Sequence, residues 1–170
     1  MKDLVEKSVK GDKRAFVEMV EHNAQKLYRI ALSYMKNEHD AVEAVQETTY
    51  RAFKNTNKLK TPEYFDTWIV RILINYCKSE LKKRKRDIPL GKREIPHGEQ
   101  HNLDEKLTVE KAVDKLPQSY RETVILRYYE DMKIKDIAKI MKCPEGTVKG
   151  RINRALSKLE KQMSKGGAIK

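Results

Sequence analysis

Apolar residues recur at steps of three and four along the first 86 residues, the spacing that places them on one face of an α-helix. Three helices are predicted here, with these apolar faces: Phe16, Met19, Val20, Leu27, Ile30, Ala31 and Tyr34 in the first; Val42, Val45, Thr49, Ala52 and Phe53 in the second; Phe65, Trp68, Ile69, Ile72 and Tyr76 in the third. Asp40 is expected to be the N-cap of the second helix. Thr61 and Pro62 separate the second helix from the third.

The pattern changes between Asp87 and Asn102, where apolar residues are few and proline and glycine recur. This composition predicts a flexible linker. Helical periodicity then resumes and pauses at Pro117, with these apolar positions: Leu103, Leu107, Val113, Leu116, Tyr120, Val124, Ile125 and Tyr128. No strand-like alternation is found in the sequence. The expected fold is all-α, with two small helical domains (residues 1–86 and 103–165) joined by the flexible linker 87–102 and followed by a tail, 166–170.

Residues 134–158 predict a helix-turn-helix. The first helix buries Ile134, Ile137, Ala138 and Met141, and Pro144 is expected in the first turn of the second helix. That second helix turns Val148, Ile152, Ala155 and Leu159 inward and Lys149, Arg151, Asn153 and Arg154 outward. In this motif the second helix enters the major groove, where Arg and Lys read guanine and Asn reads adenine. The alternative is an ordinary basic helical hairpin whose charges are only solvated.

The charge of the chain supports a polyanion as partner. Thirty-seven Lys and Arg face 25 Asp and Glu, a formal net charge of +12. Residues 78–93 account for +6 of this and residues 133–165 for +7, so the rest of the chain is close to neutral. Two separate basic segments favour binding to nucleic acid over a general solubility charge. With only 39% apolar residues, the composition also favours two small cores over one large core.

Membrane insertion and secretion are not expected. The longest apolar run is Ile72–Ile74, far short of the roughly 18 to 20 residues that span a bilayer, and no signal-peptide pattern opens the chain. Cys77 and Cys143 lack a CxxC partner, which favours reduced core thiols in a cytoplasmic protein.

Catalysis, a metal site and a cofactor are not expected either. No glycine-rich phosphate loop is present. The string most similar to a metal site consists of Glu94, His97 and His101, but Pro96 and Gly98 interrupt it, so its members would not share a helical face. A small-molecule substrate is therefore not expected.

The third predicted helix joins aromatic residues to a basic end, residues 82–86. Aromatic faces can stack unpaired bases while Lys and Arg contact phosphates, which is how single strands are captured. Taken singly, Phe65 and Trp68 fit the role of core residues better.

The order of these pieces resembles a bacterial RNA polymerase sigma factor of the extracytoplasmic-function (ECF) group. An acidic helix, DAVEAVQETTYRAF, precedes the aromatic-basic helix. After that helix come the linker, then the segment LPQSYRETVILRYYEDMKIKDIAKIM, and then the helix-turn-helix. The resemblance implies a non-enzymatic subunit that binds core RNA polymerase and directs initiation at specific promoters. Residues 1–86 would be sigma domain 2 and residues 103–165 sigma domain 4.

The resemblance also implies roles for individual residues. The residues that would dock on the clamp of the largest polymerase subunit are Asp40, Glu43, Gln46 and Glu47. Recognition of the minus-ten element falls to Tyr64, Trp68, Arg71, Asn75, Lys78, Ser79, Lys82 and Lys83, with a loop around Leu59–Tyr64 that would hold a flipped base. The residues that would recognise the minus-thirty-five element are Lys149, Arg151, Asn153 and Arg154. Gly150 and Asn153 depart from the common family pattern, so the promoter sequence does not follow from these residues.

Two further expectations concern partners and alternatives. The resemblance implies an anti-sigma factor, often membrane-bound, that would hold the chain at the inner face of the membrane; the chain itself is expected in the cytoplasm. The alternative function is a stand-alone helix-turn-helix regulator that binds duplex DNA without polymerase. That function would leave the acidic helix and the aromatic-basic helix unexplained.

Overall fold

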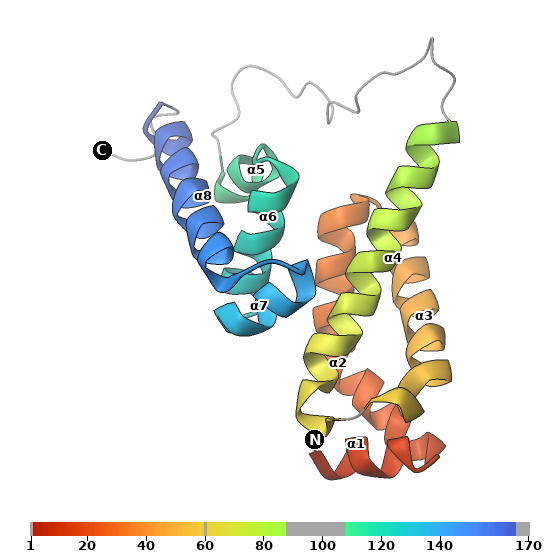
Figure 1. The fold of residues 1–170 in the computed structure, drawn as a ribbon. Coiled ribbons are helices and arrows are strands. Elements are labelled where there is room, and N and C mark those ends of the chain that lie inside the picture. Colours follow the sequence, from red (N-terminus) through yellow and green to blue (C-terminus); the bar gives the residue numbers. More distant parts are fainter. Residues whose placement is uncertain (1, 60, 88–107, 166–170) are drawn as a thin grey trace. The chain divides into compact units, whose positions relative to one another are not determined.

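The computed structural model describes residues 2–59, 61–87 and 108–165, and every regular element among them is a helix (Figure 1). The chain divides into two compact units, Met1–Asp87 and Ile88–Lys170. The expected all-α fold with two helical domains is therefore confirmed. Residues 88–102 of the predicted linker, the tail 166–170, Leu103 and Leu107 lie outside the described residues.

The first unit is built from α1 (Lys2–Val9), α2 (Lys13–Met35), α3 (Glu38–Asn55), η1 (Thr56–Lys58), η2 (Pro62–Tyr64) and α4 (Phe65–Asp87). The short elements η1 and η2 are 3₁₀-helices between α3 and α4. Helices α2, α3 and α4 pack against one another, and α1 packs on α2 (Figure 1). Their core contains Met19, Leu27 and Ile30 of α2 and Phe65, Ile69 and Leu73 of α4.

The inner face of α3 differs by one position from the predicted face. Its buried residues are Ala41, Ala44, Thr48 and Ala52. Val42 and Phe53 are instead 45% and 47% exposed, so only Ala52 was predicted correctly as buried. Small side chains let α3 approach α2 and α4 closely, and the larger apolar residues then lie at the edges of the contact.

The start of α3 also differs from the prediction. Asn37 is the N-cap, and its side-chain oxygen accepts a hydrogen bond from the Asp40 backbone N–H at 3.0 Å. Helix α2 ends at Met35, and its C-cap residue Lys36 has the left-handed conformation, φ 58°, so only Lys36 and Asn37 lie between the two helices. Asp40 therefore lies in the first turn of α3, where its charge interacts favourably with the helix dipole.

The buried face of α4 consists of Phe65, Ile69, Val70, Leu73, Ile74 and Cys77. Phe65 and Ile69 were predicted there, whereas Trp68, Ile72 and Tyr76 are only half-buried. Cys77 is a free thiol with the burial expected of a core residue, and this burial raises its pKa to about 12. Beyond Leu81, which is half-buried, α4 continues as the basic end, residues 82–86, in which every side chain is exposed.

The second unit contains α5 (Val109–Asp114), α6 (Gln118–Val124), η3 (Ile125–Tyr129), α7 (Ile134–Met141) and α8 (Glu145–Lys165). Pro117 separates α5 from α6, where the periodicity was expected to pause. One buried cluster consists of Val113, Leu116, Val124, Ile125 and Ala155, with Tyr120 and Leu159 packed against it.

Helix α6 continues into a π-helix, η3, in which the Glu130 N–H donates to the Ile125 carbonyl five positions earlier at 3.1 Å. Each turn of a π-helix holds more residues than a turn of an α-helix, so the register of the inner face shifts. Tyr128, predicted as an inner residue, is 54% exposed, and Leu126 is buried instead.

The predicted helix-turn-helix is formed by α7 and α8 (Figure 1). Ile137 and Ala138 are buried as expected, but Ile140 is buried while Ile134 and Met141 are only half-buried. The turn uses Lys142 in the left-handed conformation, φ 50°, and its N–H donates to the Ala138 carbonyl. Pro144 precedes α8 rather than lying inside its first turn, and its carbonyl accepts hydrogen bonds from two N–H groups of that turn.

None of the helices in the described ranges has the length and apolar character needed to span a bilayer.

Candidate nucleic-acid interface

Helix α8 presents a polar face on the side away from the core of the second unit. Val148, Ile152 and Ala155 are buried, and Leu159 packs against the core at the edge, as predicted. Lys149, Asn153 and Arg154 are exposed. Because the inward residues recur at steps of three and four, the three polar side chains project into solvent together. This is the arrangement a helix needs in order to contact base edges and phosphates.

Arg151 was predicted to face outward with these three residues but is half-buried. Its Nη1 lies 3.8 Å from Met141 Sδ and 3.8 Å from Cys143 Sγ. The guanidinium thus lies over the turn between α7 and α8 and contacts the residues that shape it. Cys143 is correspondingly half-buried in this turn rather than a core thiol.

Two glycines leave open surface on α8. A Cβ atom built on Gly146 or Gly150 would meet no atom within 4 Å. Packing within this chain therefore does not require glycine at either position.

The residues predicted for the minus-ten element follow one face of α4 and the turn before it. Tyr64 is 42% exposed, and Asn75, Ser79, Lys82 and Lys83 are exposed. Trp68, Arg71 and Lys78 are half-buried. Positions 64, 68, 71, 75, 78 and 82 differ by steps of three and four, so they share a face.

The first turn of α4, where that face begins, is held in place by contacts with the core and with α2. Phe65 is buried, in agreement with a core role, and its ring centroid lies 6.0 Å from that of Trp68. Asn23 of α2, also buried, donates from Nδ2 to Asp66 Oδ1 at 3.3 Å and to the Met19 carbonyl at 3.1 Å. This contact holds the first turn of α4 against α2. The signal in the sequence was an asparagine within the apolar face of α2, and its role was not predicted.

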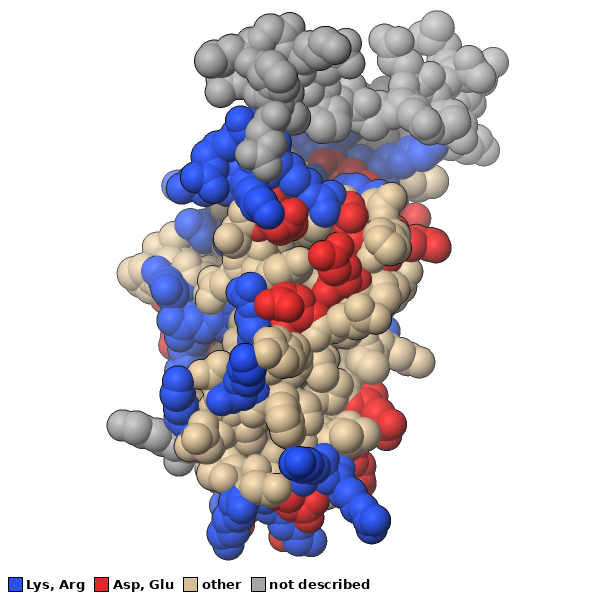
Figure 2. Space-filling model, turned by 90° about the vertical axis from the view of Figure 1, so that its right-hand side faces the viewer, with Lys and Arg blue, Asp and Glu red and all other residues tan. Residues whose placement is uncertain are grey.

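The acidic residues predicted for polymerase docking lie on α3. Glu43 and Gln46 are exposed. Glu47 is half-buried and accepts from Arg51 Nε at 2.6 Å, and Arg51 in turn lies 5.0 Å above the centre of the Tyr76 ring. Burial, together with the charges of Glu43, Glu80 and Glu47, raises the pKa of Tyr76. Acidic and basic side chains lie next to each other on this face of the first unit (Figure 2).

Asp40 is engaged by a residue of α4 that was not assigned a role. Arg84 donates from Nη1 to Asp40 Oδ2 at 2.5 Å and from Nη2 to Oδ1 at 3.0 Å. Arg84 Nε also lies 3.3 Å from Glu80 Oε1. These hydrogen bonds lower the pKa of the Asp40 carboxyl and raise that of the Arg84 guanidinium. One cation of the basic end of α4 is thus neutralised within the unit, and the Asp40 side chain is only 18% exposed.

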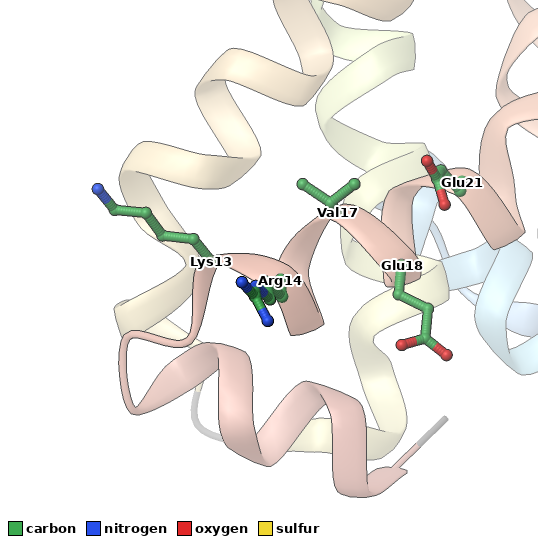
Figure 3. A pocket seen from close by; sticks show the side chains of 5 residues that line it. All are labelled: Lys13, Arg14, Val17, Glu18 and Glu21. Carbon is green, nitrogen blue, oxygen red and sulfur yellow. The ribbon is translucent and has the colours of Figure 1, made fainter.

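A shallow hollow of about 390 Å³ lies along α2, lined by Lys13, Arg14, Val17, Glu18 and Glu21 (Figure 3). All five residues come from one face of a single helix, and none was predicted as a site residue. The hollow is therefore an open helix surface. No group of three or more His, Cys, Asp or Glu side chains could hold a metal ion in the described ranges, and Glu94, His97 and His101 lie outside them.

Comparison with known families assigns both units. The model described as "Sigma-70 region 2" matches residues 19–87, and "Sigma-70, region 4" matches residues 106–159. RNA polymerase sigma factor SigV of Bacillus subtilis (strain 168) is 33% identical over 157 residues, covering 90% of this chain and 93% of that protein. ECF RNA polymerase sigma factor SigW of the same organism is 28% identical over 180 residues, covering 96% of each.

Two solved structures share the fold. One is CnrH in complex with the cytosolic domain of CnrY, with a TM-score of 0.73, 22% identity and 96% of each chain covered. The other is the sigma factor RpoE in complex with the anti-sigma factor NepR from Bartonella quintana. Its TM-score is 0.72, its identity 24%, and the match covers 88% of this chain and 96% of that one.

The two family matches, to sigma-70 regions 2 and 4, define a protein of transcription initiation, and the helix-turn-helix of the second unit lies within the region 4 match. The chain belongs to the RNA polymerase sigma factors, and within them to the ECF type with regions 2 and 4. The resemblance found in the sequence is confirmed. The protein is a non-enzymatic factor that directs promoter recognition. The region 2 match also accounts for the acidic and aromatic-basic helices, which a stand-alone regulator would leave unexplained.

Proposed function

We propose that this sigma factor divides promoter recognition between its two units. Sigma domain 4, residues 103–165, reads the minus-thirty-five element as a duplex, and sigma domain 2, residues 1–86, binds core polymerase and captures the opened minus-ten strand. The observation that carries the proposal is the exposed group Lys149, Asn153 and Arg154 on the second helix of a helix-turn-helix. Its position opposite a buried face fits insertion into a major groove.

At the minus-thirty-five element, Lys149 and Arg154 contact phosphates or guanine edges, and Asn153 reads a base edge. Arg151 acts from a different position, because its guanidinium lies over Met141 and Cys143. It supports the turn that aims α8 and reaches DNA only at the edge of the contact.

At the minus-ten element, the face that runs from Tyr64 along α4 binds the opened strand. Tyr64 and Trp68 stack unpaired bases, and Lys78, Lys82 and Lys83 contact phosphates, with Arg71, Asn75 and Ser79 between them. Opening a few base pairs costs a few kcal/mol, and stacking returns about 1 to 3 kcal/mol per base, so capture can drive opening. The exposure of Tyr64 and the partial exposure of Trp68 support this role.

Core polymerase docks on α3 through Glu43, Gln46 and Glu47, with Asp40 at the end of the face. The exposure of Glu43 and Gln46 supports this assignment. Asp40 would contribute through the part of its carboxylate that Arg84 leaves open. The partner surface is the clamp of the largest subunit, and a basic or amide-rich surface there would complement α3.

An anti-sigma factor is the proposed regulator of this chain. RpoE of Bartonella quintana was solved in complex with the anti-sigma factor NepR, and CnrH was solved in complex with the cytosolic domain of CnrY. An equivalent partner would cover the polymerase-binding and DNA-binding faces. We place this sigma factor in the cytoplasm with its polymerase, and a membrane-bound anti-sigma factor would hold it at the inner face of the membrane.

Run-off transcription with core polymerase on genomic fragments tests the proposal. Discrete transcripts that require this chain are expected, and their start points define the two promoter elements. Tight, specific binding of a duplex by the isolated chain, unchanged when core polymerase is added, would overturn it in favour of a stand-alone regulator.

A further inference from the structure

The N-terminal helix α1 contacts the segment that precedes α4. It packs on α2 and also touches both η1 and η2, the two short helices between α3 and α4. Helix η1 precedes the loop expected to hold a flipped base, and η2 forms the end of that loop and finishes at the exposed Tyr64. The region 2 family match begins at residue 19, so α1 lies before the part of the chain to which that match assigns a role.

Helix α1 is held in place by its own buried residues and by the turn that joins it to α2. Val5 is fully buried and Ser8 is almost fully buried. A tight turn follows, in which Gly11 has φ 101° and donates from its N–H to the Ser8 carbonyl at 2.9 Å. Asp12 then caps α2 by accepting hydrogen bonds from the N–H groups of Arg14 and Ala15 at 2.9 and 3.1 Å. The packing of α1 on α2 and this short capped turn hold the two helices together.

The contact with η2 includes an ion pair. Lys2 Nζ lies 2.9 Å from Glu63 Oε1, and Glu63 immediately precedes Tyr64. At the other end of the segment, η1 follows α3 directly, and Thr56 Oγ1 donates to the Ala52 carbonyl of α3 at 2.8 Å. Its end is held by the buried Phe65 of α4. Helix α1 therefore supplies a further support of η2, on the side next to Tyr64.

We propose that α1 is a positioning element for promoter opening, because it holds η2 and Tyr64 in the geometry that captures an unpaired minus-ten base. This inference rests on the proposed minus-ten role of domain 2. A segment that is already held in its bound conformation before DNA arrives loses less conformational entropy on binding. More of the free energy of its contacts with the base is then available for capture.

The test compares charge variants of the ion pair in the reconstituted holoenzyme. The probes are the duplex promoter identified by run-off transcription and the same promoter with its minus-ten region opened by mismatches. The variants are Lys2→Glu, Glu63→Lys and the double exchange. Lys7→Glu is the matched control, since it makes the same charge change on α1 but its partner at 2.8 Å is Asp3 of the same helix.

Lys2→Glu is expected to slow open-complex formation on the duplex about twofold to fivefold, the range of one exposed ion pair. It should also reduce discrimination between the cognate minus-ten base and a substituted one, and the mismatched probe should restore the opening rate. The double exchange should recover most of the loss, and Lys7→Glu should behave as the unchanged protein. A double-mutant cycle removes the separate effects of each charge on DNA affinity.

Val5→Ala tests the packing of α1 without changing charge. It is expected to lower discrimination at the minus-ten base while core affinity stays unchanged, and circular dichroism reports whether the unit remains folded. Equal discrimination by Lys2→Glu and Lys7→Glu, or no recovery in the double exchange, would overturn the inference. Failure of the unchanged holoenzyme to initiate at any promoter would instead overturn the proposed function, so the two failures are distinguishable.

Discussion

Arg84, near the end of α4, holds Asp40, in the first turn of α3, through both of its terminal nitrogens at 2.5 and 3.0 Å. The two residues are 44 positions apart in the chain. The fully buried face of α4 ends at Cys77, so this pair adds a fixed point beyond it. It connects the helix expected to meet the minus-ten strand with the helix expected to meet polymerase.

Replacing Arg84 with Ala is expected to weaken promoter binding more than the loss of one charge. The ion pair is partly exposed, so its loss should cost the fold about 1 kcal/mol or less. The basic end of α4, however, would lose its fixed direction. Lys85→Ala is the control, because it removes the neighbouring cation and leaves the Asp40 contact intact. Fluorescence anisotropy of the holoenzyme on its promoter compares the two variants; equal affinities would contradict a positioning role for Arg84.

The pair also predicts a pH dependence. Hydrogen bonds from Arg84 favour the charged form of Asp40 and lower its pKa, an effect that partial burial opposes. Its stabilisation of the fold is therefore complete above the ordinary range of aspartate, about pH 4, and is lost as pH falls through the lowered pKa. A carboxyl NMR titration should show Asp40 titrating below the ordinary range of aspartate. In Arg84→Ala its pKa should return toward the ordinary value, and an unchanged titration would show that the pair is absent in solution.

On α8, Arg154→Ala and Arg151→Ala should have different effects. Loss of the exposed Arg154 should weaken minus-thirty-five binding and lower the salt dependence of the affinity by roughly one phosphate contact. Arg151→Ala should in addition lower the melting temperature, because its guanidinium contacts two sulfur atoms of the turn. Holoenzyme affinity over a salt series and thermal unfolding provide the measurements, with Lys161→Ala as the control. Identical unfolding of the two arginine variants would contradict the supporting role of Arg151.

Reversal of the charge of Glu43 should impair core polymerase binding before it affects DNA binding. Glu43 is exposed, whereas Glu47 also has an ion pair with Arg51, so Glu43→Lys is the simpler test of the docking face. Glu18→Lys on α2 makes the same charge change on another helix and serves as the control. Competition with a labelled sigma factor for core polymerase measures the effect. A similar loss in both variants would point to a general charge effect instead of docking on α3.

Gly150→Ala should stabilise the protein by about 0.5 to 1 kcal/mol, because a glycine inside a helix is unfavourable and the added methyl group meets no neighbour. Urea unfolding measures the gain, which would be missing if α8 were frayed at this position. Minus-thirty-five affinity measured on the same variant gives separate information. A fall in affinity together with higher stability would indicate that DNA approaches the backbone at Gly150.

Helical periodicity was sufficient to predict the fold class and the inward residues of α8. Val148, Ile152 and Ala155 were identified because large and small apolar residues there alternate with strongly polar ones. The same reasoning failed on α3, where Ala41 and Ala44 form the contact and Val42 lies outside it. A hydrophobicity pattern favours large apolar residues and does not register that close helix packing requires small ones.

The other differences arise from contacts between distant positions or from backbone geometry. The ion pair of Asp40 with Arg84 joins residues far apart in the chain, and no local pattern indicates it. Arg151 was expected to point outward because it is charged, but it follows Val148 by three positions and precedes Ala155 by four, which places it beside the inward face, where its long side chain lies over the neighbouring turn. The exposure of Tyr128 follows from the π-helix, which no residue of that segment signals by itself.

Because of that π-helix, the orientation of the helix-turn-helix relative to α6 is sensitive to the number of residues in Ile125–Tyr129. A π-helix is a stretch that contains one residue more than the α-helix that would otherwise form there. Deleting one residue within Ile125–Tyr129 would let the segment close as an ordinary α-helix and would rotate α7 and α8 about its axis by about 100°. The helix-turn-helix would then meet α6 from another direction, although every side chain expected to touch DNA would be unchanged. We therefore expect promoter recognition by this sigma factor to depend on the number of residues in one short segment as well as on their identity.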